Sequence, residues 1–263
     1  MDFQISGKKA LVCAASKGLG KAIALALAGE GVELLLTARS ADLLKGAAEE
    51  CTQAGSPKVA THVCDLTENS ARAQLIEVVR KQLQHVDILV HNVGGPKPTM
   101  ALDTSVEEWQ KGYEQLFPAV AQLNMAFLPE MRKRKWGRIV AVTSLSVLEP
   151  IAGLAISNAM RSAVTAMLKT LADEVAADGV TINCIAPGLI NTDRTDALMK
   201  ARIEKSGQSQ DDYMRDYLKS IPAQRLGDTG EFGAVAAFLC SQQASYVTGS
   251  TIAVDGGKRR STY

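Results

Sequence analysis

The amino-acid sequence predicts a single α/β domain in which a doubly wound parallel sheet of about seven strands has helices on both faces. Three observations support this prediction. Short, continuous apolar runs are typical of strands that are buried on both faces. These runs alternate with helical segments of about 10 residues or more, as crossovers between parallel strands require. The length of 263 residues and the hydrophobic content of 46% suit one large domain with its own core.

The local patterns predict each element in order. The predicted strands are short apolar runs at residues 10–13, 32–37, 59–64, 86–91, 138–143, 181–186 and 252–254. The predicted helices are periodic or rich in Ala and Leu, at residues 21–30, 41–54, 70–84, 105–134 and 156–177, with a further helix at Asp228. Pro118 and Pro129 are points of possible irregularity in the long fourth helix.

We expect one domain over residues 1–263, with one insertion around residues 191–225. The insertion is polar and charged and follows directly after a predicted strand. Ligands of doubly wound sheets bind at the carboxyl ends of the strands. The position of the insertion therefore predicts a mobile lid over a substrate.

The composition excludes several classes of protein. A formal net charge of +1 argues against a nucleic-acid partner, and no segment approaches the ~20 apolar residues of a membrane span. The N-terminus has no apolar signal segment, and the basic run at residues 258–260 is expected to be a solvated tail. The five cysteines form no Cys-x-x-Cys pair, and the three histidines share no metal-ligand spacing. We therefore expect a cytoplasmic protein with buried, reduced thiols and no metal.

A loop of small residues joins the first predicted strand to the first helix. Small side chains let backbone amides approach a pyrophosphate, and the N-terminus of the helix adds a favourable dipole. The loop predicts a dinucleotide site and contains Ala14, Ser16, Lys17, Gly18, Leu19 and Gly20.

This loop and later motifs together resemble the short-chain dehydrogenase/reductase family, in particular its ketoacyl-carrier-protein-reductase-like branch. The family pattern Thr-Gly-x-x-x-Gly-x-Gly is matched at Gly18 and Gly20, with Cys13 and Ala14 in place of its first two residues. The resemblance implies a Rossmann-like fold, a small-molecule substrate and a homotetramer or homodimer. Further matches are Asp65 and Leu66, Asn92 and Gly94 after His91, residues 137–140, Pro187 and Gly188 with Thr192, and residues 246–249 and 254–257. In the family these motifs surround a nicotinamide dinucleotide.

The segment after the second predicted strand indicates which dinucleotide binds. Enzymes that select NAD place a carboxylate there to bind the ribose hydroxyls. This chain has Arg39 and no acid, and Lys17 adds a second cation from the loop. A guanidinium can bind a 2′-phosphate with two hydrogen bonds, so the pair predicts NADP(H). The alternative is that both are solvated surface cations.

The family's reaction centre uses Asn, Ser, Tyr and Lys, and this chain keeps only one of them. Aligned on residues 137–140, the serine is Ser144, the tyrosine position is Ser157, the lysine position is Arg161 and the asparagine position is Leu116. We predict that Ser144, Ser157 and Arg161 form an atypical reaction centre, with Arg161 also contacting the cofactor. Open alternatives are a structural Ser144, a helix-capping Ser157 and an ion-paired Arg161.

Other groups could supply the proton, and other functions fit the pattern. His91, Glu149, Tyr213 and Tyr217 are candidate donors, although a hydrogen-bonded core histidine, a solvated carboxylate and packed tyrosines are the simpler interpretations. The sequence favours an NADP(H)-dependent oxidoreductase acting on a carbonyl or alcohol. The alternatives are a non-catalytic or regulatory NADP-binding protein and chemistry without hydride transfer, as in halohydrin dehalogenases.

Overall fold

A computed structural model describes residues 2–207 and 209–262 of the chain. The described residues form one parallel seven-stranded sheet in the order β3-β2-β1-β4-β5-β6-β7. The predicted fold class is therefore confirmed. The strands are β1 Lys9–Cys13, β2 Glu33–Ala38, β3 Val59–Val63, β4 Ile88–His91, β5 Gly137–Val142, β6 Val180–Pro187 and β7 Thr251–Val254.

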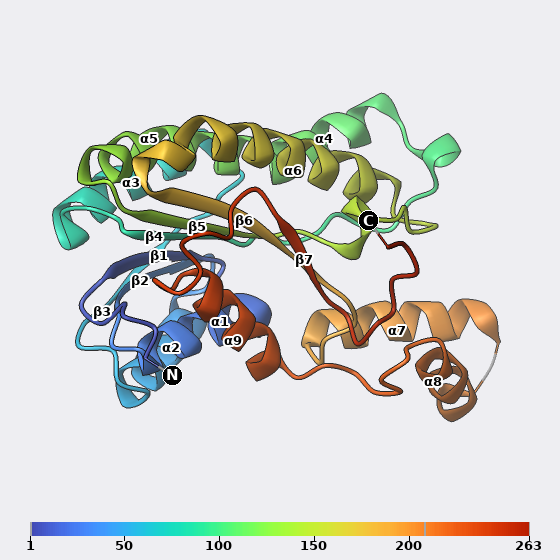
Figure 1. Cartoon of the computed structure of the whole chain (residues 1–263). Coiled ribbons are helices and arrows are strands. Elements are labelled where there is room, and N and C mark those ends of the chain that lie inside the picture. Colours follow the sequence, from blue (N-terminus) through green and yellow to red (C-terminus); the bar gives the residue numbers. More distant parts are fainter. Residues whose placement is uncertain (1, 208, 263) are drawn as a thin grey trace.

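Helices cover both faces of the sheet (Figure 1). One layer contains α1 Gly18–Gly29, α2 Ala41–Gln53 and α9 Thr229–Leu239, and α1 packs against the other two. The opposite layer contains α3 Asn69–Leu83, α4 Val106–Leu116, α5 Pro118–Arg134 and α6 Ala155–Val175. Short 3-10 helices are η1 Ala101–Asp103, η2 Leu145–Val147 and η3 Ala176–Asp178.

The sheet separates two hydrophobic cores, and alternate residues of each strand enter different cores. In β1, Ala10 and Val12 belong to the core beneath α1 and α9, whereas Leu11 and Cys13 belong to the core beneath α3 to α6. The side-chain period of two in a strand produces this division. All five cysteines are free and buried, as expected from the sequence. Within the described residues, none of the helices combines the length and the apolar character needed to cross a bilayer.

The predicted long helix at residues 105–134 is wrong in one respect, because it is two helices. α4 ends at Leu116, and Phe117 separates it from α5, which begins at Pro118. Proline suits the first position of a helix because its missing N–H would have no partner there. Pro129 lies inside α5 and does not end it.

The insertion at residues 191–225 contains two helices, α7 Asp193–Ser206 and α8 Gln210–Lys219. The side chain of Thr192 caps α7 by accepting a hydrogen bond from the Thr195 amide, and Ser209 caps α8 in the same way through Asp212. Figure 1 shows both helices beyond α9, outside the two helical layers. Both helices contribute residues to the wall of a cavity at the carboxyl edge of the sheet.

Candidate active site

A cavity of about 740 Å³ lies at the carboxyl edge of the sheet. It extends from the loop after β1, past the ends of β2 to β6, to the insertion helix α7. The cavity brings together every site residue predicted from the sequence except Gly20. Its walls include Ala14, Ser16, Lys17, Gly18, Leu19, Arg39, Asp65, Leu66, Asn92, Gly94, Ser144, Ser157, Arg161, Pro187, Gly188 and Thr192.

The loop after β1 presents the N-terminus of α1 to this cavity. Lys17 is the N-cap residue and makes no capping hydrogen bond with its side chain, so the first-turn amides are available to a ligand. Gly20 lies behind the cavity wall, where an added Cβ would be 2.2 Å from the carbonyl oxygen of Ala14. Ala14 itself has a φ of 47°, a left-handed conformation that explains why the family pattern has glycine at this position.

The two cations predicted to select NADP(H) have different surroundings. Arg39 is exposed at the end of β2 and forms no ion pair with any described residue. Lys17 is already engaged, because its Nζ lies 2.8 Å from the Asp193 carboxylate at the start of α7. Arg39 is therefore the better-placed cation for an incoming phosphate. The Lys17–Asp193 ion pair instead links the dinucleotide loop to the insertion.

Asp65 lies beside Arg39, after β3. The pKa of its carboxyl is lowered chiefly by a hydrogen bond from the Thr67 amide, against the opposing effect of burial. The Thr67 hydroxyl and the charge of Arg39 lower it further. Asp65 is therefore a fixed anionic acceptor at this end of the cavity.

Ser144 and Ser157 line the opposite end of the cavity. Ser144 follows β5, and its Oγ accepts a hydrogen bond of 3.1 Å from the Ser146 amide. Ser157 is 8% exposed and is the third residue of α6, whereas the N-cap of that helix is Leu154. The capping alternative for Ser157 is therefore wrong. Both hydroxyls remain able to donate a hydrogen bond into the cavity.

Arg161 lies one helical turn after Ser157 and joins the ends of two strands. Its guanidinium donates to the carbonyl oxygen of Val142 at 3.0 Å and to that of Val93 at 3.2 Å. It forms no ion pair within residues 2–207 and 209–262, so the ion-pair alternative is wrong. Burial, followed by the charge of Arg194, lowers its pKa to about 10. Arg161 therefore remains cationic at neutral pH, although it is 8% exposed.

His91 is buried in the core and hydrogen-bonded, as the simpler interpretation predicted. Its Nε2 lies 3.1 Å from Oδ1 of Asn124, and burial lowers the pKa of its imidazole to about 4 despite that hydrogen bond. His91, Leu116 and Arg161 are among the residues that line a second, very small cavity. Asn124 was not predicted from the sequence. The signal that could have indicated it is one buried amide among the apolar residues of the fourth predicted helix.

The remaining candidate donors are at the rim. Glu149 is exposed and lines the main cavity, and Tyr217 lines it while stacking on Tyr213 at 6.2 Å between ring centroids. The expectation of a solvated basic tail is wrong for Lys258, because its Nζ donates to the Ser220 carbonyl at 3.3 Å and lies over the Tyr217 ring. The basic run alone does not indicate this contact, because Ser220 and Tyr217 belong to the insertion, about 40 residues earlier in the sequence.

The sheet order and the cavity define a doubly wound α/β protein with a dinucleotide-type loop at its topological switch point. A family described as enoyl-(acyl carrier protein) reductase matches residues 13–259. The 3-oxoacyl-[acyl-carrier-protein] reductase of Escherichia coli (strain K12) is 34% identical over 98% of both chains. The chain belongs to the short-chain dehydrogenase/reductase family.

Two further relatives are reductases that use NADPH. The NADPH-dependent reductase BacG of Bacillus subtilis is 29% identical over 98% of this chain and 100% of the relative. The crystal structure of L-sorbose reductase from Gluconobacter frateurii, complexed with NADPH and L-sorbose, is 32% identical. Its TM-score is 0.93, covering 99% of this chain and 100% of that chain.

Proposed function

We propose that this chain is an NADP(H)-dependent oxidoreductase that transfers a hydride between the nicotinamide and a carbonyl or alcohol substrate, at an atypical reaction centre. The observation that carries this proposal is the continuous cavity, which connects the dinucleotide loop and Arg39 to Ser144, Ser157 and Arg161. Family membership and the NADPH-dependent relatives support it. The proposed lid is the insertion at residues 191–225, which supplies α7 to the same cavity.

The proposed cofactor site fits a phosphorylated dinucleotide along its length. Free amides at the start of α1 suit the diphosphate, and the exposed guanidinium of Arg39 suits the 2′-phosphate. The end of β2 has no carboxylate that would repel that phosphate. The remaining cofactor contacts are assigned by resemblance to Asp65, Leu66, Asn92, Gly94, Pro187, Gly188 and Thr192, all of which line the cavity.

The proposed reaction centre polarises the substrate and does not supply an acidic side chain. When bound, NADPH supplies the hydride to the carbonyl carbon. Ser144 and Ser157 hold the carbonyl oxygen with neutral hydrogen bonds, and Arg161 adds positive charge beside it. A serine hydroxyl has a far higher pKa than a phenol, and Arg161 stays protonated at neutral pH, so no side chain of the proposed centre gives up a proton. The substrate alkoxide takes the proton that completes the alcohol from bulk solvent.

The second candidate function is a non-catalytic or regulatory NADP-binding protein. One observation favours it: the positions of the family's tyrosine and lysine hold Ser157 and Arg161, and the nearby His91 is fixed in the core. The two functions make the same prediction for cofactor binding and opposite predictions for turnover.

Two experiments test the proposal. The first compares cofactor titrations, and the second uses a double variant that carries the family's tyrosine and lysine. We expect tighter binding of NADPH than of NADH, measured by nicotinamide fluorescence, and NADPH consumption with at least one member of a carbonyl panel. The Ser157→Tyr, Arg161→Lys double variant should gain activity on simple ketones, with Ser162→Tyr as a control on the exposed side of α6. Absence of NADPH binding contradicts both functions. Tight binding without turnover, in the wild type and the double variant, favours the second.

We also propose a homotetramer or homodimer, as the family resemblance implies. Exposed apolar side chains on α4 and α5, including Val106, Tyr113 and Met125, are consistent with a helical interface. Light scattering during size-exclusion chromatography measures the state directly, and a monomer at micromolar concentration contradicts this part of the proposal.

A further inference from the structure

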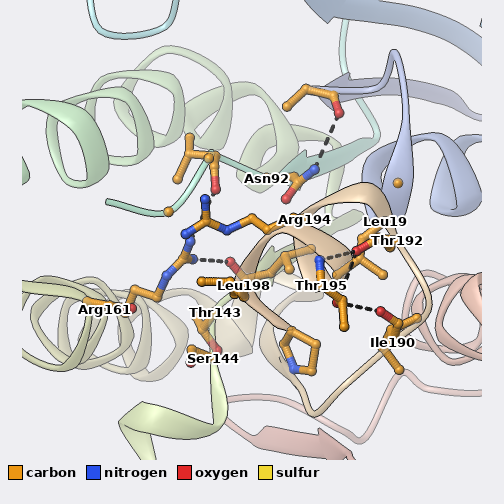
Figure 2. A pocket seen from close by; sticks show the side chains of 18 of the residues that line it. Leu19, Asn92, Thr143, Ser144, Arg161, Ile190, Thr192, Arg194, Thr195 and Leu198 are labelled. Carbon is orange, nitrogen blue, oxygen red and sulfur yellow. Dashed lines mark hydrogen bonds between the residues drawn. The ribbon is translucent and has the colours of Figure 1, made fainter. Parts of the chain in front are cut away.

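Two guanidinium groups approach each other at the reaction end of the cavity. Arg161 extends from α6, and Arg194 extends from the first turn of α7, on the opposite wall (Figure 2). Nη2 of Arg194 donates to the carbonyl oxygen of Pro96 at 3.1 Å, while Arg161 donates to carbonyl oxygens at the end of β5 and in the loop after β4. The pKa of Arg161 is lowered mainly by burial and, to a smaller extent, by the charge of Arg194.

Neither cation has an acidic partner in the part of the chain that the structure describes. Their hydrogen bonds to Val142, Val93 and Pro96 end on neutral backbone carbonyl oxygens, and no carboxylate within residues 2–207 and 209–262 forms an ion pair with either arginine. The two like charges repel each other, and the burial of Arg161, which is 8% exposed, adds a desolvation cost. An anion placed between them would offset both costs and would have the forked donors that carboxylates prefer.

We infer that Arg161 and Arg194 bind a carboxylate of the substrate, so that the substrate is an oxo acid in reduction or a hydroxy acid in oxidation. This inference rests on the proposed function. Ser157 is much smaller than the tyrosine of the family pattern, which leaves room beside Arg161 for the acid group. The nearby cavity wall is apolar and can contact the carbon skeleton through Ile151, Leu154 and Leu198.

The position of Arg194 separates this anion from the cofactor's diphosphate. The first-turn amides of α1 are the expected diphosphate site, and Thr192 faces that loop, with its Cγ2 3.8 Å from the position of an added Cβ on Gly18. Arg194, two residues later, extends instead toward Pro96 and Arg161 (Figure 2). Its charge is therefore placed at the end of the cavity where Ser144 lies.

The test compares acids with their neutral methyl esters in complexes with NADP⁺, in which an oxo acid cannot be reduced. The probes are 2-oxobutanoate, acetoacetate and 4-oxopentanoate, each paired with its methyl ester, and binding is measured by calorimetry. Arg194→Gln removes the charge and keeps a polar, although shorter, side chain. Arg215→Gln is the matched control, because Arg215 is an exposed arginine of the same insertion that does not line the cavity.

We expect at least one acid to bind about tenfold more tightly than its ester, and Arg194→Gln to remove most of that preference. Arg215→Gln should keep it. Equal binding of acids and esters, or no binding of any acid at millimolar concentration, overturns the inference. If NADP⁺ still binds in that experiment, the proposed function is not contradicted. Weaker NADP⁺ binding by Arg194→Gln with an unchanged acid preference assigns this arginine to the cofactor and also overturns it. Failure of NADP⁺ to bind the wild type contradicts the proposed function itself.

Discussion

The buried imidazole of His91 makes the stability of the fold depend on pH. Burial lowers the pKa of His91 from 6.5 to about 4, and the hydrogen bond with Asn124 only partly offsets that effect. Between pH 6.5 and about pH 4, the His91 imidazole is protonated in the unfolded chain and neutral in the folded chain. The stability contribution is therefore fully present above pH 6.5 and is lost progressively as the pH falls toward 4.

The size of the effect follows from the two pKa values. For one group with these values, the free energy of unfolding decreases by about 2 kcal/mol between about pH 7 and pH 5. His91→Asn removes the titrating group and should remove this part of the pH dependence, whatever its effect on stability at neutral pH. Urea unfolding of both proteins at the two pH values measures the difference.

A second variant separates titration from simple destabilisation. Val140 is fully buried in β5 and carries no charge, so Val140→Ala should lower stability by a similar amount at both pH values. The reasoning is refuted if wild type and His91→Asn lose the same free energy on acidification. The same result would restore His91 as a candidate proton donor, because its folded pKa would then be near 6.5.

Three further predictions concern the dinucleotide loop and Arg39. Ala14→Gly should raise the free energy of unfolding by about 0.5–1 kcal/mol, because the left-handed φ of 47° strains alanine more than the added flexibility of glycine costs; no gain in urea unfolding would contradict this. Gly20→Ala should weaken NADPH binding, because its Cβ would lie 2.6 Å from Nδ2 of Asn92 and the loop must shift; an unchanged fluorescence titration would count against it. Arg39→Asp should weaken NADPH binding by about 10–100-fold and favour NADH, as matched titrations would show.

The sequence predicted the fold well because the fold depends on local patterns. Strands buried on both faces are continuous apolar runs, and each helix between them has its own period, so the alternation was visible without tertiary information. Pro118 and Pro129 were both expected as points of irregularity, and the sequence did not show which of them marks a break, because proline suits the first position of a new helix and also occurs inside one.

Most of the predicted site residues line one cavity, but their contacts could not be predicted from the sequence. The residues of the loop after β1 and those at the ends of the other strands meet because the strands are parallel, which the alternation implied. The partners of Arg161 are Val142 and Val93, separated from it by 19 and 68 residues, and no local pattern contains such pairs. The direction of Arg194 depends in the same way on how α7 docks.

The contacts of Arg161 bear on how the proposed reaction centre can work. A lysine at this position would have one ammonium group, whereas the guanidinium donates to the carbonyl oxygens of both Val142 and Val93 and still has other N–H groups. It is therefore held in place before any ligand arrives. A fixed charge costs no reorganisation when negative charge develops on a substrate oxygen, so it stabilises that charge efficiently. With neutral serines beside it, such a centre acts through electrostatics and positioning, and its rate should depend on how electrophilic the carbonyl already is.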